Sequence, residues 1–171
     1  MVKKMHLLID GYNLIHASGE LLMAYDRGAG EEALASALNL YRKKRSHRIT
    51  IILDGGEDPE GSKASLKGIP VIYSGARESA DDVIARLCSH QGPGATVITD
   101  DRELKGRCRV HGSLVMGSHE FSRRLLEAAM DMVPMDLDDD DQGWDFTTRK
   151  KGPSRREPKS KRLKNKRFNK I

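Results

Sequence analysis

The sequence predicts an α/β fold in which helices cover both faces of a mostly parallel central sheet. Short apolar segments alternate with helical patterns between residues 5 and 132, and this alternation is typical of β-α-β units. Residues 49–53 are β-branched and apolar at nearly every position, as expected for a strand that is covered on both faces. The last 25 residues show neither pattern, so we expect a folded domain followed by a tail.

Five segments are predicted to be strands because they are short, apolar and bounded by Gly, Pro or Asp. These strands are residues 5–9, 49–53, 69–73, 95–99 and a last, glycine-interrupted one within 110–116. Pro70 suits the start of a strand or an edge strand. Residues 14–25 are apolar without a clean period, and residues 57–67 are predicted to be a polar loop.

Helices are predicted where apolar residues recur at helical spacing. Residues 31–45 have acids in the first turn and bases in the last, which complements the helix dipole. A second helix opens with the capping box of Ser79 and Asp82. After residue 101 we expect a short helical turn broken at Gly106, and then a final helix capped by Ser118. One face of that final helix is predicted to carry Phe121, Leu125, Ala129 and Met132.

Charge divides the chain into an acidic body and a basic end. The whole chain carries +5, and residues 147–171 carry +11 from 12 Lys and Arg against one Glu, which leaves −6 for residues 1–146. We therefore predict a folded domain at 1–134, an acidic linker at 135–146 and a basic tail at 147–171. The tail has too few apolar residues to offset its ordering entropy, so we expect it to be disordered when free.

The cysteine content and the lack of targeting segments limit the compartment. Cys88 and Cys108 form no spacing motif, and two cysteines do not make a disulfide framework. The first apolar run breaks at Asp10 without a cleavage site, and no stretch approaches the length of a membrane span. We expect a soluble, cytoplasmic protein with no membrane contact.

Acidic residues follow the predicted strands or open the helix after one. They are Asp10, Asp54, Asp81 and Asp100, with Asp82 and Asp101 doubling two of them. Each one alone is explained by a turn or a helix cap. If the strands are parallel neighbours, however, their carboxyl ends bring the acids to one edge. Two like charges about 4 Å apart repel by roughly 4 kcal/mol at an effective dielectric of about 20.

Such crowding requires protonation of some carboxyl groups or a divalent cation. All-oxygen ligation, helped by the amide of Asn13, indicates Mg²⁺ or Mn²⁺ rather than zinc, and the six histidines show no ligand spacing. A carboxylate-held metal pair activates water and stabilises both oxygens of a phosphodiester displacement. The sequence therefore predicts metal-dependent phosphodiester hydrolysis.

The basic tail is predicted to contact the phosphates of RNA. The residues expected to do so are Lys150, Lys151, Arg155, Arg156, Lys161, Arg162, Lys164, Lys166 and Arg167. Alternatives are a solubilising tail, a segment that folds back on the acids at 138–141, or a nuclear-localisation signal. Only Phe168 interrupts the run, so base stacking by the tail is not predicted.

Four motifs resemble the motif series of the NYN domain, most closely its YacP-like branch among the PIN-like nucleases. The motifs are Leu8-Ile9-Asp10-Gly11-Tyr12-Asn13-Leu14-Ile15, Ile52-Leu53-Asp54-Gly55, Ser79-Ala80-Asp81-Asp82 and Ile98-Thr99-Asp100-Asp101. The resemblance spans roughly residues 5–130 and leaves out the tail after Trp144. It implies a PIN-like three-layer α/β/α sandwich, a Mg²⁺ or Mn²⁺ site and RNA endonuclease activity, as in a member that acts on messenger RNA at the ribosome.

The resemblance also implies roles for individual residues. Asp10 and Asp100 become metal ligands, Asp81 a further ligand or water-orienting acid, and Asn13 a metal or phosphate contact. Asp54 is the fourth acid. With the neighbouring acid included, the implied catalytic set is Asp10, Asn13, Asp54, Asp81, Asp82 and Asp100.

Three other functions are compatible with parts of the sequence. A non-catalytic RNA-binding or ribosome-associated factor would keep the fold and lose the turnover. A receiver-like phosphoacceptor module would use Asp54, but Gly11 stands where such a module needs a second acid. A P-loop would need a Lys and a Ser or Thr after Gly28-Ala29-Gly30, and these are missing.

Overall fold

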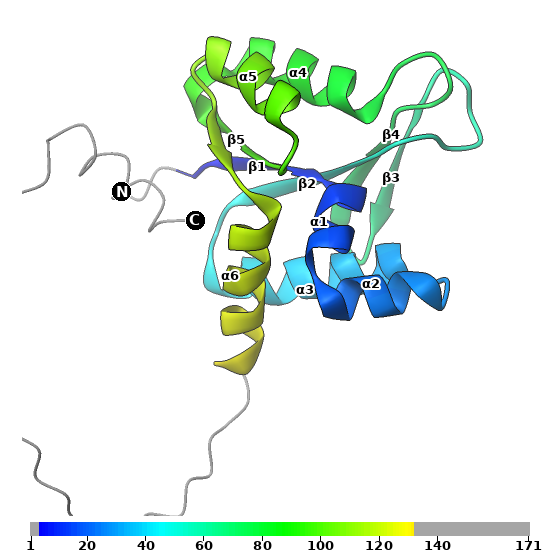
Figure 1. Ribbon diagram of the computed structural model, residues 1–171, viewed down its shortest axis with the longest axis vertical. Coiled ribbons are helices and arrows are strands. Elements are labelled where there is room, and N and C mark those ends of the chain that lie inside the picture. The colour runs from blue at the N-terminus through cyan, green and yellow to red at the C-terminus, as the bar shows by residue number, and fades with distance from the viewer. Residues whose placement is uncertain (1–3, 132–171) are drawn as a thin grey trace, which may run out of the picture. The chain divides into compact units, whose positions relative to one another are not determined.

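The computed structural model describes residues 4–131, which form a six-stranded sheet between two layers of helices (Figure 1). The strand order is β3-β4-β2-β1-β5-β6. The strands are β1 (His6–Asp10), β2 (Arg48–Leu53), β3 (Ser62–Leu66), β4 (Ile69–Tyr73), β5 (Ala95–Ile98) and β6 (Leu114–Met116). All neighbours are parallel except β3 and β4, which confirms the predicted mostly parallel sheet.

Helices cover both faces of this sheet. Their bounds are α1 (Gly11–Ala17), α2 (Gly19–Asp26), α3 (Gly30–Lys44), α4 (Ala80–Gln91), α5 (Arg102–Val110) and α6 (Ser118–Met130), with a 3₁₀ turn at Gly92–Gly94. In Figure 1, α4 and α5 lie on one face, and α1, α2, α3 and α6 lie on the other. The prediction of an α/β/α sandwich is thereby confirmed.

Two apolar layers hold the sandwich together. Leu8 of β1 and Ile52 of β2 pack against α4 and α5, together with Cys88 and Cys108. Because strand side chains alternate between faces, the fully buried Leu7 and Ile9 point to the opposite helical layer. In that layer the rings of Tyr41 and Phe121 meet edge to face, with centroids 5.1 Å apart, and join α3 to α6.

The order of the strands determines where a ligand can bind. From β1 the chain moves to β2 and then β4 on one side, whereas α4 carries it back to β5 on the other side of β1. The direction of winding therefore reverses between β1 and β5. In open α/β sheets the crevice beyond the carboxyl ends of strands at such a reversal is the usual ligand site.

The structure corrects several local predictions. Residues 14–25, which showed no single period, belong to two short helices that meet at Ser18. The predicted loop at 57–67 contains the edge strand β3, whose middle three residues are exposed, so its sequence lacks an apolar signal. Pro70 is tolerated inside β4 because pairing with β2 begins only at Val71.

The predicted break of the helix at Gly106 is wrong, because α5 continues through Gly106 to Val110. Leu104 and Cys108 of this helix are buried. The last strand is accordingly shorter than predicted and starts at Leu114.

The final helix is confirmed, but its cap and its face differ from the prediction. Ser118 is its first residue rather than its cap. Phe121 and Leu125 are buried as predicted, whereas Ala128 is buried more fully than Ala129. Met132 lies outside the described residues, as do the predicted linker and tail. Among residues 4–131, no helix has the length and apolarity needed to cross a membrane.

Candidate active site

A pocket of about 230 Å³ lies at the carboxyl edge of the sheet. Its lining residues come from the ends of β1 and β2 and from the starts of α1 and α4, and they are Asp10, Tyr12, Asp54, Ser79, Ala80 and Asp81. Three of the predicted acids therefore share one pocket. We call Asp10, Asp54 and Asp81, with Asp101 beside them, the acidic cluster.

Asp10 reaches the pocket because α1 begins immediately after β1. Its Oδ1 atom accepts the backbone N–H of Asn13 at 3.4 Å and caps α1. Gly11 allows this sharp step, since a Cβ atom there would overlap Cδ2 of Leu53 and lie 3.1 Å from the carbonyl oxygen of Ile52. Close packing of α1 on β2 therefore favours glycine directly after Asp10.

Asp10 has neutral hydrogen-bond donors only. Thr99 donates its hydroxyl to Oδ2 at 3.0 Å, and no Lys or Arg of residues 4–131 forms an ion pair with this carboxylate. Burial raises the pKa of Asp10 to about 6, and the charges of Asp81 and Asp101 act in the same direction, whereas the bonds from Thr99 and Asn13 oppose the rise. Among residues 4–131, the pocket carboxylate of Asp10 therefore has no ion-pair partner to compensate its charge.

The charge of Asp101 acts on the carboxyl group of Asp81. Burial raises the pKa of Asp81, Asp101 raises it further, and the nearby Arg107 opposes the rise. Asp101 caps α5, with Oδ1 accepting the backbone N–H of Leu104 at 2.7 Å. A like charge beside Asp81 favours binding of a cation there.

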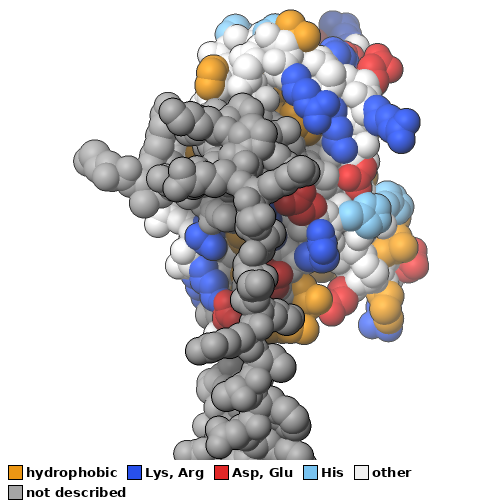
Figure 2. Space-filling view, turned by 60° about the vertical axis from the view of Figure 1, so that its left-hand side comes forward, with side chains coloured by type: hydrophobic (Ala, Val, Ile, Leu, Met, Phe, Trp, Pro, Cys, Tyr) orange, Lys and Arg blue, Asp and Glu red, His pale blue; other side chains and the backbone are white. Residues whose placement is uncertain are grey.

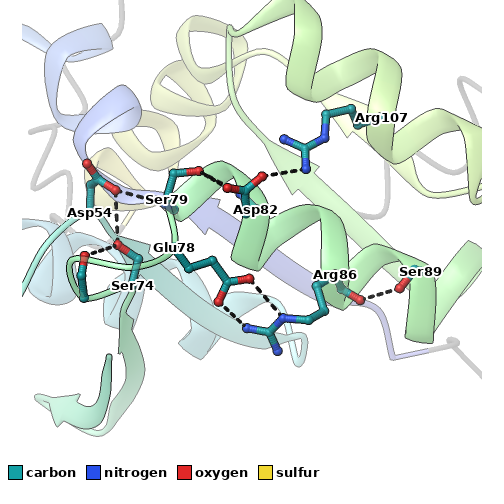
Figure 3. A network of polar contacts seen from close by, with 10 residues as sticks. Asp54, Ser74, Glu78, Ser79, Asp82, Arg86, Ser89 and Arg107 are labelled. Atoms are coloured by element: carbon teal, nitrogen blue, oxygen red, sulfur yellow. Dashed lines mark hydrogen bonds and ion pairs between the residues drawn. The ribbon is translucent and has the colours of Figure 1, made fainter. Parts of the chain in front are cut away.

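Asp54 connects the end of β2 to the start of α4. Its Oδ1 atom accepts the hydroxyl of Ser74 at 3.1 Å and the backbone N–H of Ala80 at 3.0 Å. Figure 3 shows this carboxylate between Ser74 and the first turn of α4. Asp54 thus positions the helix turn that carries Asp81.

Asp82 points away from the pocket. It accepts a hydrogen bond from Arg107 of α5 at 2.7 Å and one from the hydroxyl of Ser79 at 2.8 Å (Figure 3). Ser79 in turn accepts the backbone N–H of Asp82, which completes the predicted capping box. The geometry gives Asp82 a role in tying α4 to α5, and its proposed catalytic role stays a prediction without support from its position.

Asp100 also points away from Asp10 and toward the start of α6. Its Oδ1 atom accepts the backbone N–H of Ser118 at 3.0 Å, and its Oδ2 atom lies 2.5 Å from Nδ1 of His119. Because Gly117 provides no side-chain cap, Asp100 caps this helix from outside. A Cβ atom at position 117 would lie 2.8 Å from Oδ1 of Asp100, so glycine is needed there.

Asn13 of α1 contacts both Asp100 and Ser118, the first residue of α6. Its Oδ1 atom accepts the backbone N–H of Asp100 at 2.8 Å and the hydroxyl of Ser118 at 2.6 Å. An amide oxygen has two lone pairs, so both are used by the chain itself. Any contact of Asn13 with a phosphate would have to come from its NH₂ group.

From the sequence, Asp100 rather than Asp101 is predicted to be a metal ligand, and Thr99 is not singled out; in the structure Asp101 is the acid whose charge acts on Asp10 and Asp81. Thr99 donates to Asp10 and accepts the backbone N–H of Asp101 at 3.1 Å, so it orients both acids. A hydroxyl residue directly before an acid pair at a strand end was the available signal. Which of two successive acids turns inward depends on the local backbone, which residue type alone does not determine.

A basic helix borders the acidic cluster. Its four basic residues are Arg102, Lys105, Arg107 and Arg109 of α5. Arg107 pairs with Asp82, and Nζ of Lys105 lies 3.9 Å from Asp100, whereas Arg102 and Arg109 form no ion pair within residues 4–131. Figure 2 shows Lys and Arg side chains gathered at the height where Figure 1 draws α4 and α5. Such a surface next to the pocket suits a phosphate backbone.

The carboxylate oxygens of the pocket are the type of ligand that a hard divalent cation such as Mg²⁺ prefers. No three His, Cys, Asp or Glu side chains among residues 4–131 are close enough to form a complete metal cage. Mg²⁺ in phosphoryl-transfer sites, however, keeps several waters and is held by one or two carboxylates together with substrate phosphates. Asp10 and Asp81 supply two such carboxylates at the pocket.

A doubly wound α/β/α sandwich with acids at the carboxyl edge is the arrangement expected of PIN-like nuclease domains. Within that class the chain belongs to the YacP-like NYN domain family, whose model matches residues 7–171. The match extends to the last residue, so the expectation that the tail after Trp144 lies outside the resemblance was wrong.

Solved structures agree with this fold. The chain is similar to the crystal structure of Rae1 (YacP) from Bacillus subtilis, with 23% identity, a TM-score of 0.61, and coverage of 73% of this chain and 75% of that one. A tryptophan-to-leucine mutant of the same Bacillus subtilis protein gives 22% identity, a TM-score of 0.63, and coverage of 74% and 78%. Among curated proteins, none matches.

Family membership implies a nuclease-type function directed at RNA, and the NYN nuclease family is generally dependent on divalent metal. RNA is accordingly the implied substrate class.

Proposed function

We propose that this protein is a metal-dependent endoribonuclease that hydrolyses RNA phosphodiester bonds. The observation that supports this most directly is the environment of Asp10. Its buried carboxylate has hydroxyl and amide donors, two acidic neighbours and a raised pKa. A merely structural capping residue does not need like charges beside it, whereas a ligand for Mg²⁺ or Mn²⁺ does.

In the proposed mechanism Asp10 and Asp81 hold the cation, with Asp100 and Asp101 as alternative third acids. A bound divalent ion would supply an activated water and stabilise the phosphorane-like charge. Thr99 orients Asp10 by donating its hydroxyl, and Asp54 holds the first turn of α4 in place. The basic residues of α5 would attract the phosphate backbone.

We further propose messenger RNA, in association with the ribosome, as the substrate and the cytoplasm as the compartment. The tail residues from Lys150 to Arg167 lie outside the described residues, and their role as phosphate contacts remains a proposal. Electrostatic contact of this kind weakens steeply with salt. Deletion of residues 147–171 should therefore flatten the salt dependence of RNA binding and preserve cleavage of short substrates.

The test is cleavage of an end-labelled RNA with Mg²⁺, Mn²⁺ or EDTA. Wild type should produce internal cleavage products with metal and none with EDTA, and Asp10→Asn should produce none. Asp82→Asn is the matched control, because Asp82 faces Arg107 rather than the pocket. Cleavage by Asp10→Asn at the wild-type rate would refute the proposal.

A second candidate is a non-catalytic RNA-binding or ribosome-associated factor. It is favoured by the lack of a complete three-ligand cage within residues 4–131. RNA binding that persists in EDTA, with no product under any metal, would select this function over the first.

A further inference from the structure

Tyrosine rings gather beside the acidic pocket around the carboxylate of Glu31. Tyr12 donates its hydroxyl to Oε1 of Glu31 at 3.0 Å, and Tyr73 donates to Oε2 at 2.8 Å. Tyr12 also lines the pocket with Asp10. Glu31 therefore fixes the Tyr12 ring at the edge of the candidate active site.

A third tyrosine, Tyr25, extends this group toward solvent. Its ring centroid lies 6.0 Å from that of Tyr12 and 5.6 Å from that of His16, both in edge-to-face geometry. The Tyr25 residue is 42% exposed. We call Tyr12, His16 and Tyr25 the aromatic shelf.

The packing of α3 keeps Tyr25 in this position. A Cβ atom at Gly30 would lie 2.7 Å from Cβ and 2.9 Å from Cα of Tyr25. Glycine at the first position of α3 therefore allows that helix to approach the Tyr25 backbone closely. Tyr25 is held in place while much of its surface stays accessible.

The distribution of aromatic residues separates the shelf from the core. Residues 4–131 contain five Tyr, Phe and Trp residues. Tyr41 and Phe121 are buried at 2% and 0% exposure and pack on each other. The other three all lie around Glu31 or in contact with Tyr12, so the non-core aromatic surface of the described domain is concentrated at one side of the pocket.

We propose that the aromatic shelf stacks a nucleobase of single-stranded RNA whose backbone enters the acidic pocket. This inference rests on the proposed function and specifies its substrate class. Aromatic rings stack on any base and thereby bind single strands without strong sequence preference. In a duplex the bases are already stacked and paired, so they are unavailable to such a surface. The shelf would thus make the enzyme select unpaired RNA.

The test is the affinity of full-length protein for a fluorescent single-stranded RNA of about 12 nucleotides, measured by anisotropy in EDTA so that no cleavage occurs. Tyr25→Ala should weaken binding by about 5- to 100-fold, the range expected for one stacked base. Tyr25→Phe retains the ring and should stay within about twofold of wild type. Met23→Ala is the matched control, because Met23 lies on the same helix and is 58% exposed but has no aromatic ring.

A second measurement separates stacking from a change in fold. An RNA series with one abasic nucleotide at successive positions should identify a position at which wild type loses affinity and Tyr25→Ala does not. A duplex of the same length should bind wild type and Tyr25→Ala equally. Unchanged affinity of Tyr25→Ala for the single strand would overturn the shelf alone. Failure of wild type to cleave any of these RNAs when Mn²⁺ is added would overturn the proposed function as well.

Discussion

The polar residues at the two ends of β1 lie in different electrostatic environments. At the amino end, His6 is 9% exposed, and both ring nitrogens have partners, Gln91 at 2.7 Å and Thr50 at 2.8 Å. At the carboxyl end, burial raises the pKa of Asp10, and the charges of Asp81 and Asp101 act in the same direction. The amino end of β1 therefore carries an imidazole with partners for both nitrogens, whereas the carboxyl end carries a carboxyl group whose ionisation is unfavourable. The difference indicates that one edge of the sheet contributes to stability and the other to ligand binding.

The largest expected effect is on cleavage. Asp10→Asn should lower the rate of RNA cleavage by at least about 1000-fold, because it removes a charge from the proposed cation site. His6→Ala should leave the rate per folded molecule within about twofold. The measurement is initial cleavage velocity at saturating Mn²⁺, normalised to the folded fraction by circular dichroism. Equal losses in both variants would remove the functional distinction between the two edges.

The next effect is on stability at the amino end. His6→Ala should lower the free energy of unfolding by about 2 kcal/mol at pH 7.5, because Gln91 and Thr50 lose a buried partner. Burial lowers the pKa of His6, against a rise from its bond with Gln91. The unfolded chain therefore binds more protons, and the wild-type advantage should be complete above about pH 6.5 and decrease as the pH falls. Urea unfolding at several pH values provides the check, and an advantage that grows on acidification would contradict it.

Asp10→Asn should raise the free energy of unfolding, whereas His6→Ala should lower it. The folded-state pKa of Asp10 is raised to about 6 from 3.8, so the cost of its charge is absent below about pH 3.8 and complete above about pH 6. Without added metal, the variant should be more stable than wild type by about 1–2 kcal/mol at pH 7.5, since about two pKa units correspond to nearly 3 kcal/mol before lost hydrogen bonding. The gain should vanish near pH 4. A variant less stable than wild type at pH 7.5 would show that Asp10 is a structural cap only.

The smallest effect is expected away from both edges. Gly106 lies within α5, and a Cβ atom there meets nothing within 4 Å. Gly106→Ala should therefore stabilise the protein by about 0.5–1 kcal/mol through helix propensity. The shift in urea midpoint should be the same from pH 5 to 8, unlike those of the His6 and Asp10 variants. A pH-dependent shift would mean that α5 transmits the charge state of the acidic cluster.

The sequence was sufficient for the apolar strands such as β2 and for the start of α4, because strand hydrophobicity and the capping box at Ser79 are local signals. It was insufficient for β3, which is mostly polar and exists through pairing with β4. It also predicted a break at Gly106, where burial of Leu104 and Cys108 outweighs the low helix propensity of glycine.

For the site, the sequence located the carboxyl edge and the acids Asp10, Asp54 and Asp81 that line one pocket. It did not predict that Asp82 and Asp100 turn toward Arg107 and the start of α6. Those orientations depend on contacts between residues far apart in the chain, such as Asn13 with Ser118 at 2.6 Å. Residue types and spacing along one segment contain no information about such partners.

The clasp that Asn13 forms with Asp100 and Ser118 joins the first helix to the last. A ribosome that has made only the first hundred residues has produced Asp10, Asp54, Asp81 and Asp100, but not the start of α6, to which Asn13 and Asp100 bond. The junction of α1, β5 and α6 is therefore completed late in synthesis, after the chain has passed residue 118.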